Sequence, residues 1–263
     1  MSKALMTIHG FLTSTKDFGR LYDYLDFYDE IKAVEVPGHN ADTPDFSLFQ
    51  VDVTFKTLLD AYDDLRSRHD QVDVAGFSMG GALTTWLCSV KDVHRAVLLA
   101  PANKYINLLM PFDAGKFYGG FGLKTYREAD GKLSNKLGAT EYAYTPYREN
   151  MATTAKIFWE RFLRNLTPHT YNVFSKLVKK SDVVVETMSP ITTPTLIMWG
   201  KLDELVPYSS VKFVLKHFSN IQEKIYPDVG HVLLYTNRDH LMIADIVEFL
   251  SEGTVKKEVP PRE

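Results

Sequence analysis

The chain has 263 residues, of which 45% are hydrophobic and 24% are charged, and its formal net charge is −3. This composition is that of an average globular protein, and the length suits one α/β domain with an insertion. The small negative charge, without a basic stripe, argues against a nucleic-acid partner. No stretch approaches the roughly 18 consecutive apolar residues of a membrane span, so we expect no stable membrane insertion.

The first strand-like run covers residues 4–8, almost at the start of the chain. Because only Met1 to Lys3 precede it, we expect no signal peptide and a cytoplasmic location. Cys88 is the only cysteine, which excludes an intrachain disulfide. The oligomeric state is left open by the sequence.

Strand-like and helix-like runs alternate along the first hundred residues. Residues 31–36 and 95–100 read as strands, and the latter run ends at Pro101. Between them, apolar residues recur at helical spacing over residues 55–65. Alternation of this kind predicts a mostly parallel sheet with helices on its faces.

The most informative motif is the pentapeptide G-F-S-M-G at residues 76–80. It follows a strand-like run at 72–75 and opens a helix-like run at 81–87, which is the context that a G-x-S-x-G nucleophile elbow requires. Glycine at the flanking positions allows the strand and the helix to approach closely. The alternative is an ordinary turn with an exposed serine, and partners for Ser78 further along the chain argue against it.

Two partners for Ser78 follow in the order serine, acid, histidine. Asp203 comes after the buried strand-like run 195–199, and His231 comes after the strand-like run 223–226. The carboxyl ends of parallel strands form the active edge of such sheets, so we expect these side chains to meet there. Glu204, directly beside Asp203, is a rival for the acid role.

An oxyanion hole is predicted from two backbone N–H groups. One belongs to Phe11, in the loop after the first strand, and the other to Met79, the residue after the nucleophile. No metal-ligand cluster and no phosphate-binding loop is present in the sequence, so we expect neither a metal nor a cofactor.

The alternation stops between about residues 103 and 189 and resumes at Thr195. This stretch is rich in glycine and tyrosine at first and then contains helix-like runs, so we expect a largely helical cap over the active edge. Its aromatic side chains either pack the cap onto the core or line an apolar acyl pocket. The pocket candidates are Phe112, Phe121, Tyr144, Phe158 and Trp159.

Taken together, the motifs resemble those of α/β-hydrolases, most of all the bacterial carboxylesterase and monoacylglycerol-lipase-like enzymes. The matching stretches are H-G-F at 9–11, P-G-H at 37–39, G-F-S-M-G-G at 76–81, D-E-L-V-P at 203–207 and G-H at 230–231. The resemblance covers residues 4–250. It implies an α/β-hydrolase core at 1–102 and 190–250 and a cap insertion at 103–189. Counting the strand-like runs predicts a sheet of about six strands in this core. Residues 251–263 are charged and include two consecutive prolines, so we expect a flexible tail there.

The activity that this resemblance implies is that of a serine hydrolase cleaving carboxylic esters through an acyl-enzyme. Ser78 is then the nucleophile, His231 the general base, and Asp203 the group that orients the imidazole. The expected partner is a small-molecule ester. A C–C bond hydrolase, a thioesterase or an acyltransferase on the same fold are alternatives, and a catalytically silent binding protein is an alternative of another class.

Overall fold

A computed structural model of the chain shows a six-stranded sheet with helices on both faces. The strands follow the order β2-β1-β3-β4-β7-β8, and every pairing between neighbours is parallel. This confirms the α/β fold class and the sheet of about six strands predicted from the sequence. The structure describes residues 1–104, 165–201, 203, 205–227, 229–236, 238–255 and 257–261, with the backbone of two short strands at 126–127 and 133–134.

The central strands of the sheet are buried and the edge strands are more polar. The six strands are β1 (Lys3–Ile8), β2 (Glu30–Val34), β3 (Gln71–Phe77), β4 (Ala96–Leu99), β7 (Thr195–Gly200) and β8 (Ile221–Tyr226). Strands β1, β3, β4 and β7 are buried almost throughout because helices cover both of their faces. Strand β8 is exposed along most of its length, and its charged residues protect this edge from pairing with another chain. A separate antiparallel pair joins β5 (Tyr126–Arg127) and β6 (Leu133–Ser134).

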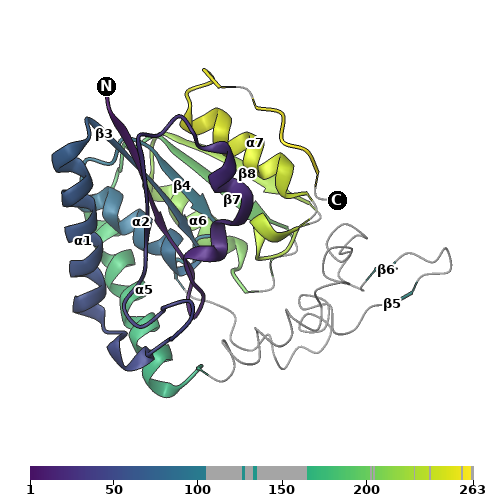
Figure 1. Ribbon diagram of the computed structural model, residues 1–263. Coiled ribbons are helices and arrows are strands. Elements are labelled where there is room, and N and C mark those ends of the chain that lie inside the picture. Colours follow the sequence, from purple (N-terminus) through teal and green to yellow (C-terminus); the bar gives the residue numbers. More distant parts are fainter. Residues whose placement is uncertain are drawn as a thin grey trace.

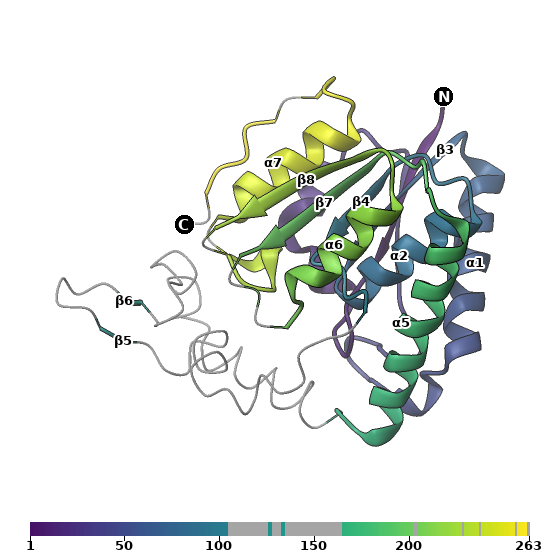
Figure 2. The ribbon, with the colours of Figure 1, turned by 180° about the vertical axis from the view of Figure 1, so that it is seen from behind.

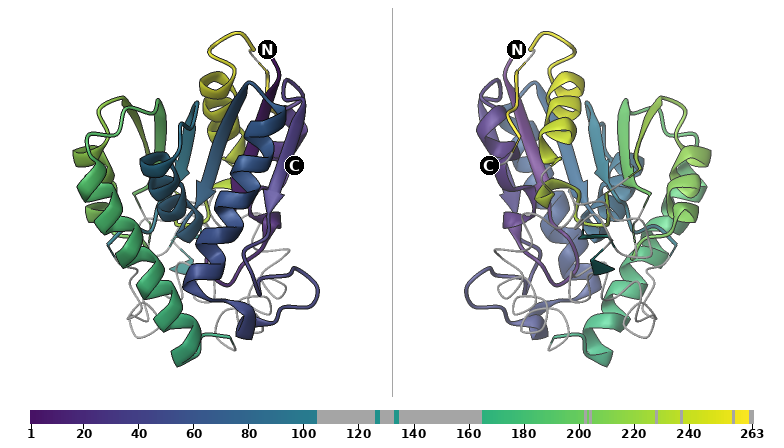
Figure 3. Two further views of the ribbon diagram at one scale, coloured as in Figure 1. Left: turned by 90° about the vertical axis from the view of Figure 1, so that its left-hand side faces the viewer. Right: turned by 90° about the vertical axis from the view of Figure 1, so that its right-hand side faces the viewer.

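Two helical layers enclose the sheet. The helices are the 3₁₀ segments η1 (Thr15–Tyr24), η2 (Phe46–Leu48) and η5 (Leu233–Tyr235), and the α-helices α1 (Val51–Arg68), α2 (Met79–Val90), α5 (Pro168–Met188), α6 (Tyr208–His217) and α7 (Asp239–Leu250). Segments η1 and α7 lie on one face, and α2, α5 and α6 lie on the other, with α1 alongside α5 (Figures 1 and 2). Figure 3 shows the same layers from the side. Within the described residues, no helix has both the length and the apolar character needed to cross a membrane.

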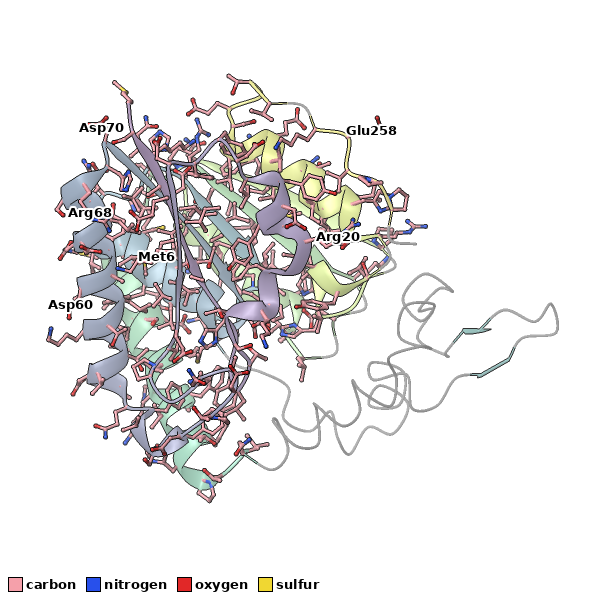
Figure 4. All side chains as sticks on the ribbon, viewed as in Figure 1. Met6, Arg20, Asp60, Arg68, Asp70 and Glu258 are labelled. Carbon is pink, nitrogen blue, oxygen red and sulfur yellow. The ribbon has the colours of Figure 1, made fainter. Side chains whose placement is uncertain are left out.

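An ion pair with a buried carboxylate joins η1 to α7. Arg20 donates from Nε and Nη2 to the carboxylate of Asp239, at 3.1 and 3.0 Å, and Asp239 is fully buried. Arg20 also donates to the carbonyl oxygen of Pro260 at 2.8 Å. Val259, the residue before Pro260, is buried. Figure 4 shows Arg20 on η1, facing the C-terminal segment. The flexibility predicted for residues 251–263 stays a prediction, and these contacts argue against it.

The two ends of the predicted cap segment, residues 103–189, are tied together by hydrogen bonds. Asp182 of α5 accepts hydrogen bonds from Nδ2 of Asn103 at 2.8 Å and from the backbone N–H of Lys104 at 2.7 Å. Burial raises the pKa of the Asp182 carboxyl above its usual range, although these hydrogen bonds act in the opposite direction. Helix α5 itself packs against α1 and α2. The cap boundaries stay a prediction, and its five candidate pocket aromatics lie outside the described residues.

Gly80→Ala is predicted to destabilise the fold severely. An added Cβ would lie 2.0 Å from the carbonyl oxygen of Ile8, so that the first turn of α2 would have to move away from β1. We expect a loss of about 3 kcal/mol or more in the free energy of unfolding, measured with urea. Gly253→Ala is the matched control, since an added Cβ there meets nothing within 4 Å and only the positive φ of 72° is unfavourable. Equal losses of unfolding free energy in the two variants would contradict the close approach of α2 to β1 at Gly80.

Candidate active site

Ser78 occupies a strained turn between β3 and α2. Its backbone has φ 53° and ψ −114°, a combination that non-glycine residues rarely adopt, and its side chain is buried. The turn is held by its own peptide groups, because the N–H of Ser78 donates to the carbonyl of Leu99 at 2.9 Å and its carbonyl accepts from the N–H of Ala102 at 2.9 Å. An added Cβ on Gly76 would lie 2.2 Å from the carbonyl oxygen of Gly80, so glycine is required on the strand side. The structure thus has the strand–turn–helix arrangement that the motif predicts.

His231 lies in hydrogen-bonding contact with Ser78. Its Nε2 is 3.0 Å from Oγ of Ser78, and its Nδ1 is 2.9 Å from Oδ2 of Asp203. A carboxylate only accepts hydrogen bonds, so Nδ1 carries the proton and Nε2 is the acceptor for the serine hydroxyl. The imidazole is 5% exposed and is therefore largely removed from water. The three side chains that the sequence singles out form one continuous chain of hydrogen bonds.

Asp203 is held in a fixed orientation by its own loop. While Oδ2 faces His231, Oδ1 accepts the backbone N–H groups of Leu205 at 2.9 Å and Val206 at 2.7 Å. The Trp199 indole, at the end of β7, donates to the carbonyl of Val206 at 3.0 Å and ties the loop to the sheet. The Asp203 side chain has no exposed surface. Glu204, the rival acid, lies outside the described residues.

The loops after β7 and β8 are brought together by a close contact. An added Cβ on Gly200 would lie 2.2 Å from the carbonyl oxygen of Val229, two residues before His231. The ring of Phe77 then packs against the His231 imidazole, with centroids 5.0 Å apart. Together these contacts place the histidine above the end of β3, where Ser78 begins the turn.

The two predicted oxyanion donors come from segments that touch. Met79 is the first residue of α2, so its N–H has no acceptor within the helix, and the positive end of the helix dipole lies there. The loop that carries Phe11 runs beside this helix start, since an added Cβ on Gly80 would lie 2.6 Å from the carbonyl oxygen of His9. The contact brings both backbones next to Ser78. Their role as oxyanion donors stays a proposal.

His9 fixes the peptide group that contains the Phe11 N–H. The N–H of Val36 donates to Nε2 of His9 at 2.9 Å, so the ring proton is on Nδ1, which donates to the carbonyl of Gly10 at 2.8 Å. The Gly10 carbonyl and the Phe11 N–H belong to one planar trans peptide unit, so holding the first sets the direction of the second. In the sequence, His9 is only a histidine that follows a strand and precedes a glycine. Its role as a bridge between Val36 and Gly10 could not be predicted from that pattern.

The described residues contain no group of three or more His, Cys, Asp or Glu side chains placed to hold a metal ion. The buried Cys88 thiol lies in α2, and burial raises its pKa to about 12, so it remains protonated at neutral pH. The nucleophile supported by the geometry is therefore the serine.

Comparisons with known proteins identify the family. A family model described as alpha/beta hydrolase fold matches residues 3–238. No curated protein gives a significant match. Solved structures do match, although at identities that establish only a shared fold.

Three solved structures illustrate the similarity. A meta-cleavage product hydrolase from Pseudomonas fluorescens IP01 has 18% identity and a TM-score of 0.62, over 96% of this chain and 92% of that one. One of two metagenome-derived lipolytic enzymes, LipS and LipT, has 16% identity and a TM-score of 0.63, over 95% and 94%. Est1E from Butyrivibrio proteoclasticus, solved with ferulic acid bound, has 18% identity and a TM-score of 0.58, over 95% and 89%. On its family match and its fold, the chain belongs to the alpha/beta hydrolase fold family.

Proposed function

We propose that this protein is a serine hydrolase that cleaves carboxylic esters of small molecules through an acyl-enzyme intermediate. The observation that carries the proposal is the hydrogen-bond chain from Ser78 through His231 to Asp203. A serine hydroxyl is a weak nucleophile at neutral pH, and a neutral imidazole within hydrogen-bonding distance is the base that activates it.

In the first half of the reaction, Ser78 Oγ attacks the ester carbonyl while its proton passes to Nε2 of His231. The carbonyl oxygen becomes an oxyanion, which the N–H groups of Phe11 and Met79 stabilise. Collapse of this intermediate breaks the bond to the alcohol oxygen. His231 returns the proton to that oxygen, and the acyl group stays on Ser78.

In the second half, water replaces the alcohol. His231 takes a proton from the water as it attacks the acyl carbonyl, and an oxyanion forms at the same place. The acyl–oxygen bond to Ser78 breaks, Ser78 regains its proton, and the carboxylic acid leaves. Asp203 retains its negative charge throughout, because its task is to orient the imidazole and to stabilise the imidazolium.

Ester hydrolysis needs only the nucleophile, base, acid and oxyanion donors that this proposal names. A C–C bond hydrolase must also stabilise a carbon leaving group, which an alkoxide-protonating histidine does not do alone. Thioesterases and acyltransferases share the acyl-enzyme and differ in the leaving group or the acceptor. A silent binding protein has no need for a buried, fully hydrogen-bonded serine, histidine and carboxylate.

Ser78 is predicted to react with a fluorophosphonate. Its activated hydroxyl should displace fluoride from phosphorus, giving one adduct per chain in the intact mass spectrum. Ser78→Ala should give none. Ser89→Ala is the matched control, since Ser89 is a buried serine of α2, the helix that follows Ser78, and its hydroxyl donates to the carbonyl of Thr85. An adduct that persists in Ser78→Ala would remove Ser78 as the nucleophile.

Asp203→Asn is predicted to lower kcat by about 10⁴. The amide cannot stabilise an imidazolium, and its NH₂ group would favour the wrong tautomer of His231. Steady-state kinetics with a nitrophenyl ester measure the effect. Glu204→Gln is the matched control and should keep near-normal kcat. If the two variants exchanged phenotypes, Glu204 would be the acid.

Carboxylic esters are predicted to be turned over faster than other acyl and carbon substrates. A panel of nitrophenyl esters of increasing acyl length, acyl thioesters and ring-cleavage diketones compares kcat/KM directly. Esters should lead, and all turnover should vanish in Ser78→Ala. Higher kcat/KM on the diketones would favour the C–C bond hydrolase instead.

A further inference from the structure

One carboxylate closes the loop that carries Phe11. Oδ2 of Asp17, in η1, accepts the backbone N–H of Gly10 at 2.8 Å and the hydroxyl of Thr13 at 2.5 Å. We call these two hydrogen bonds the Asp17 bridge. The N–H of Asp17 in turn donates to the carbonyl of Ser14 at 3.0 Å. Because Gly10 and Thr13 lie on either side of Phe11, a single oxygen atom sets the span of the loop.

The bridge encloses a strained residue. Leu12 is buried and has φ 57°, a left-handed conformation that a branched, non-glycine side chain adopts only when its surroundings enforce it. Leu12 directly follows Phe11 and lies between the two ends that Asp17 holds. Without the bridge, the loop could relax by returning Leu12 to negative φ, and the Gly10–Phe11 peptide would turn with it.

Other contacts of the described residues hold other parts of this loop. The His9 ring holds the carbonyl of Gly10, and the ring of Phe11 stacks on Phe174 of α5 with centroids 4.6 Å apart. Neither contact reaches Thr13 or relieves Leu12. The Asp17 bridge links the two ends of the turn directly.

We propose that Asp17 is a positioning residue for the oxyanion hole, acting through the Phe11 N–H. The inference rests on the proposed function of that N–H. The role of Asp17 is to accept two hydrogen bonds. Its negative charge is not part of that role, because a negative charge near the hole would disfavour an oxyanion. The substitution Asp17→Asn keeps a side-chain oxygen that can accept both bonds, whereas Asp17→Ala removes the bridge.

The test measures the rate at which Ser78 is phosphorylated by diethyl p-nitrophenyl phosphate. In this step the Ser78 Oγ–P bond forms, the P–O bond to nitrophenolate breaks, and the serine proton passes to His231. The phosphoryl oxygen occupies the oxyanion hole whichever substrate the enzyme uses. Ester kcat and KM are measured in parallel, because a displaced donor lowers kcat while leaving KM nearly unchanged.

We expect Asp17→Ala to be about tenfold to hundredfold slower in both phosphorylation and kcat, somewhat less than the ~10²–10³ that loss of a donor costs. Asp17→Asn should recover most of that rate. Thr13→Val breaks one bond of the bridge and keeps the shape of the side chain, so its rates should lie between those of Asp17→Ala and Asp17→Asn. Asp23→Ala is the matched control, as Asp23 is an exposed acid of the same segment.

Each other outcome has a definite meaning. A folded Asp17→Ala variant with wild-type phosphorylation overturns the inference, and so does an Asp17→Asn variant that is as slow as Asp17→Ala. If Asp17→Ala does not fold, as judged by circular dichroism, an unchanged rate in Thr13→Val overturns it. A wild-type protein that is not phosphorylated at Ser78 overturns the proposed function, and the inference with it.

Discussion

The close approach of helix α2 to strands β1 and β3 is the constraint on which the site depends. Added Cβ atoms on Gly76 and Gly80 would lie within 2.2 Å of backbone oxygens, so neither position has room for a side chain. Ser78 between them is forced into positive φ and becomes the last residue before the helix. The same approach sets the start of α2 against the loop after β1, so that the Met79 and Phe11 backbones share one side of the serine.

Parallel topology supplies the other half of the geometry. Every strand of the six-stranded sheet ends at the same edge, so loops distant in sequence meet there. Asp203 and His231 follow neighbouring strands β7 and β8, and their loops touch at Gly200 and Val229. The base therefore reaches Ser78, although 153 positions separate the two residues in the sequence. Buried polar groups are satisfied along this path, which keeps the imidazole in one tautomer.

Much of this could be predicted from the sequence, because the informative signals are local. The strand-like runs gave the sheet, and the glycines around Ser78 gave the elbow. The Asp17 bridge and the role of His9 could not be predicted, since each depends on backbone groups brought near by folding and has no pattern of its own. The fraying expected of the charged, proline-containing tail stays a prediction, and the burial of Val259 against the core could not be predicted from that composition.

The central claim is that Ser78 carries the acyl group during turnover, and trapping that intermediate tests it most directly. The protein is mixed with a p-nitrophenyl ester, quenched with acid during the first turnover, digested and mapped by mass spectrometry. The account predicts an acyl adduct on the peptide containing Ser78, formed together with the first burst of nitrophenolate and lost as turnover ends. Ester turnover with the acyl group on another residue, or with none detectable on Ser78 under single-turnover conditions, would contradict it.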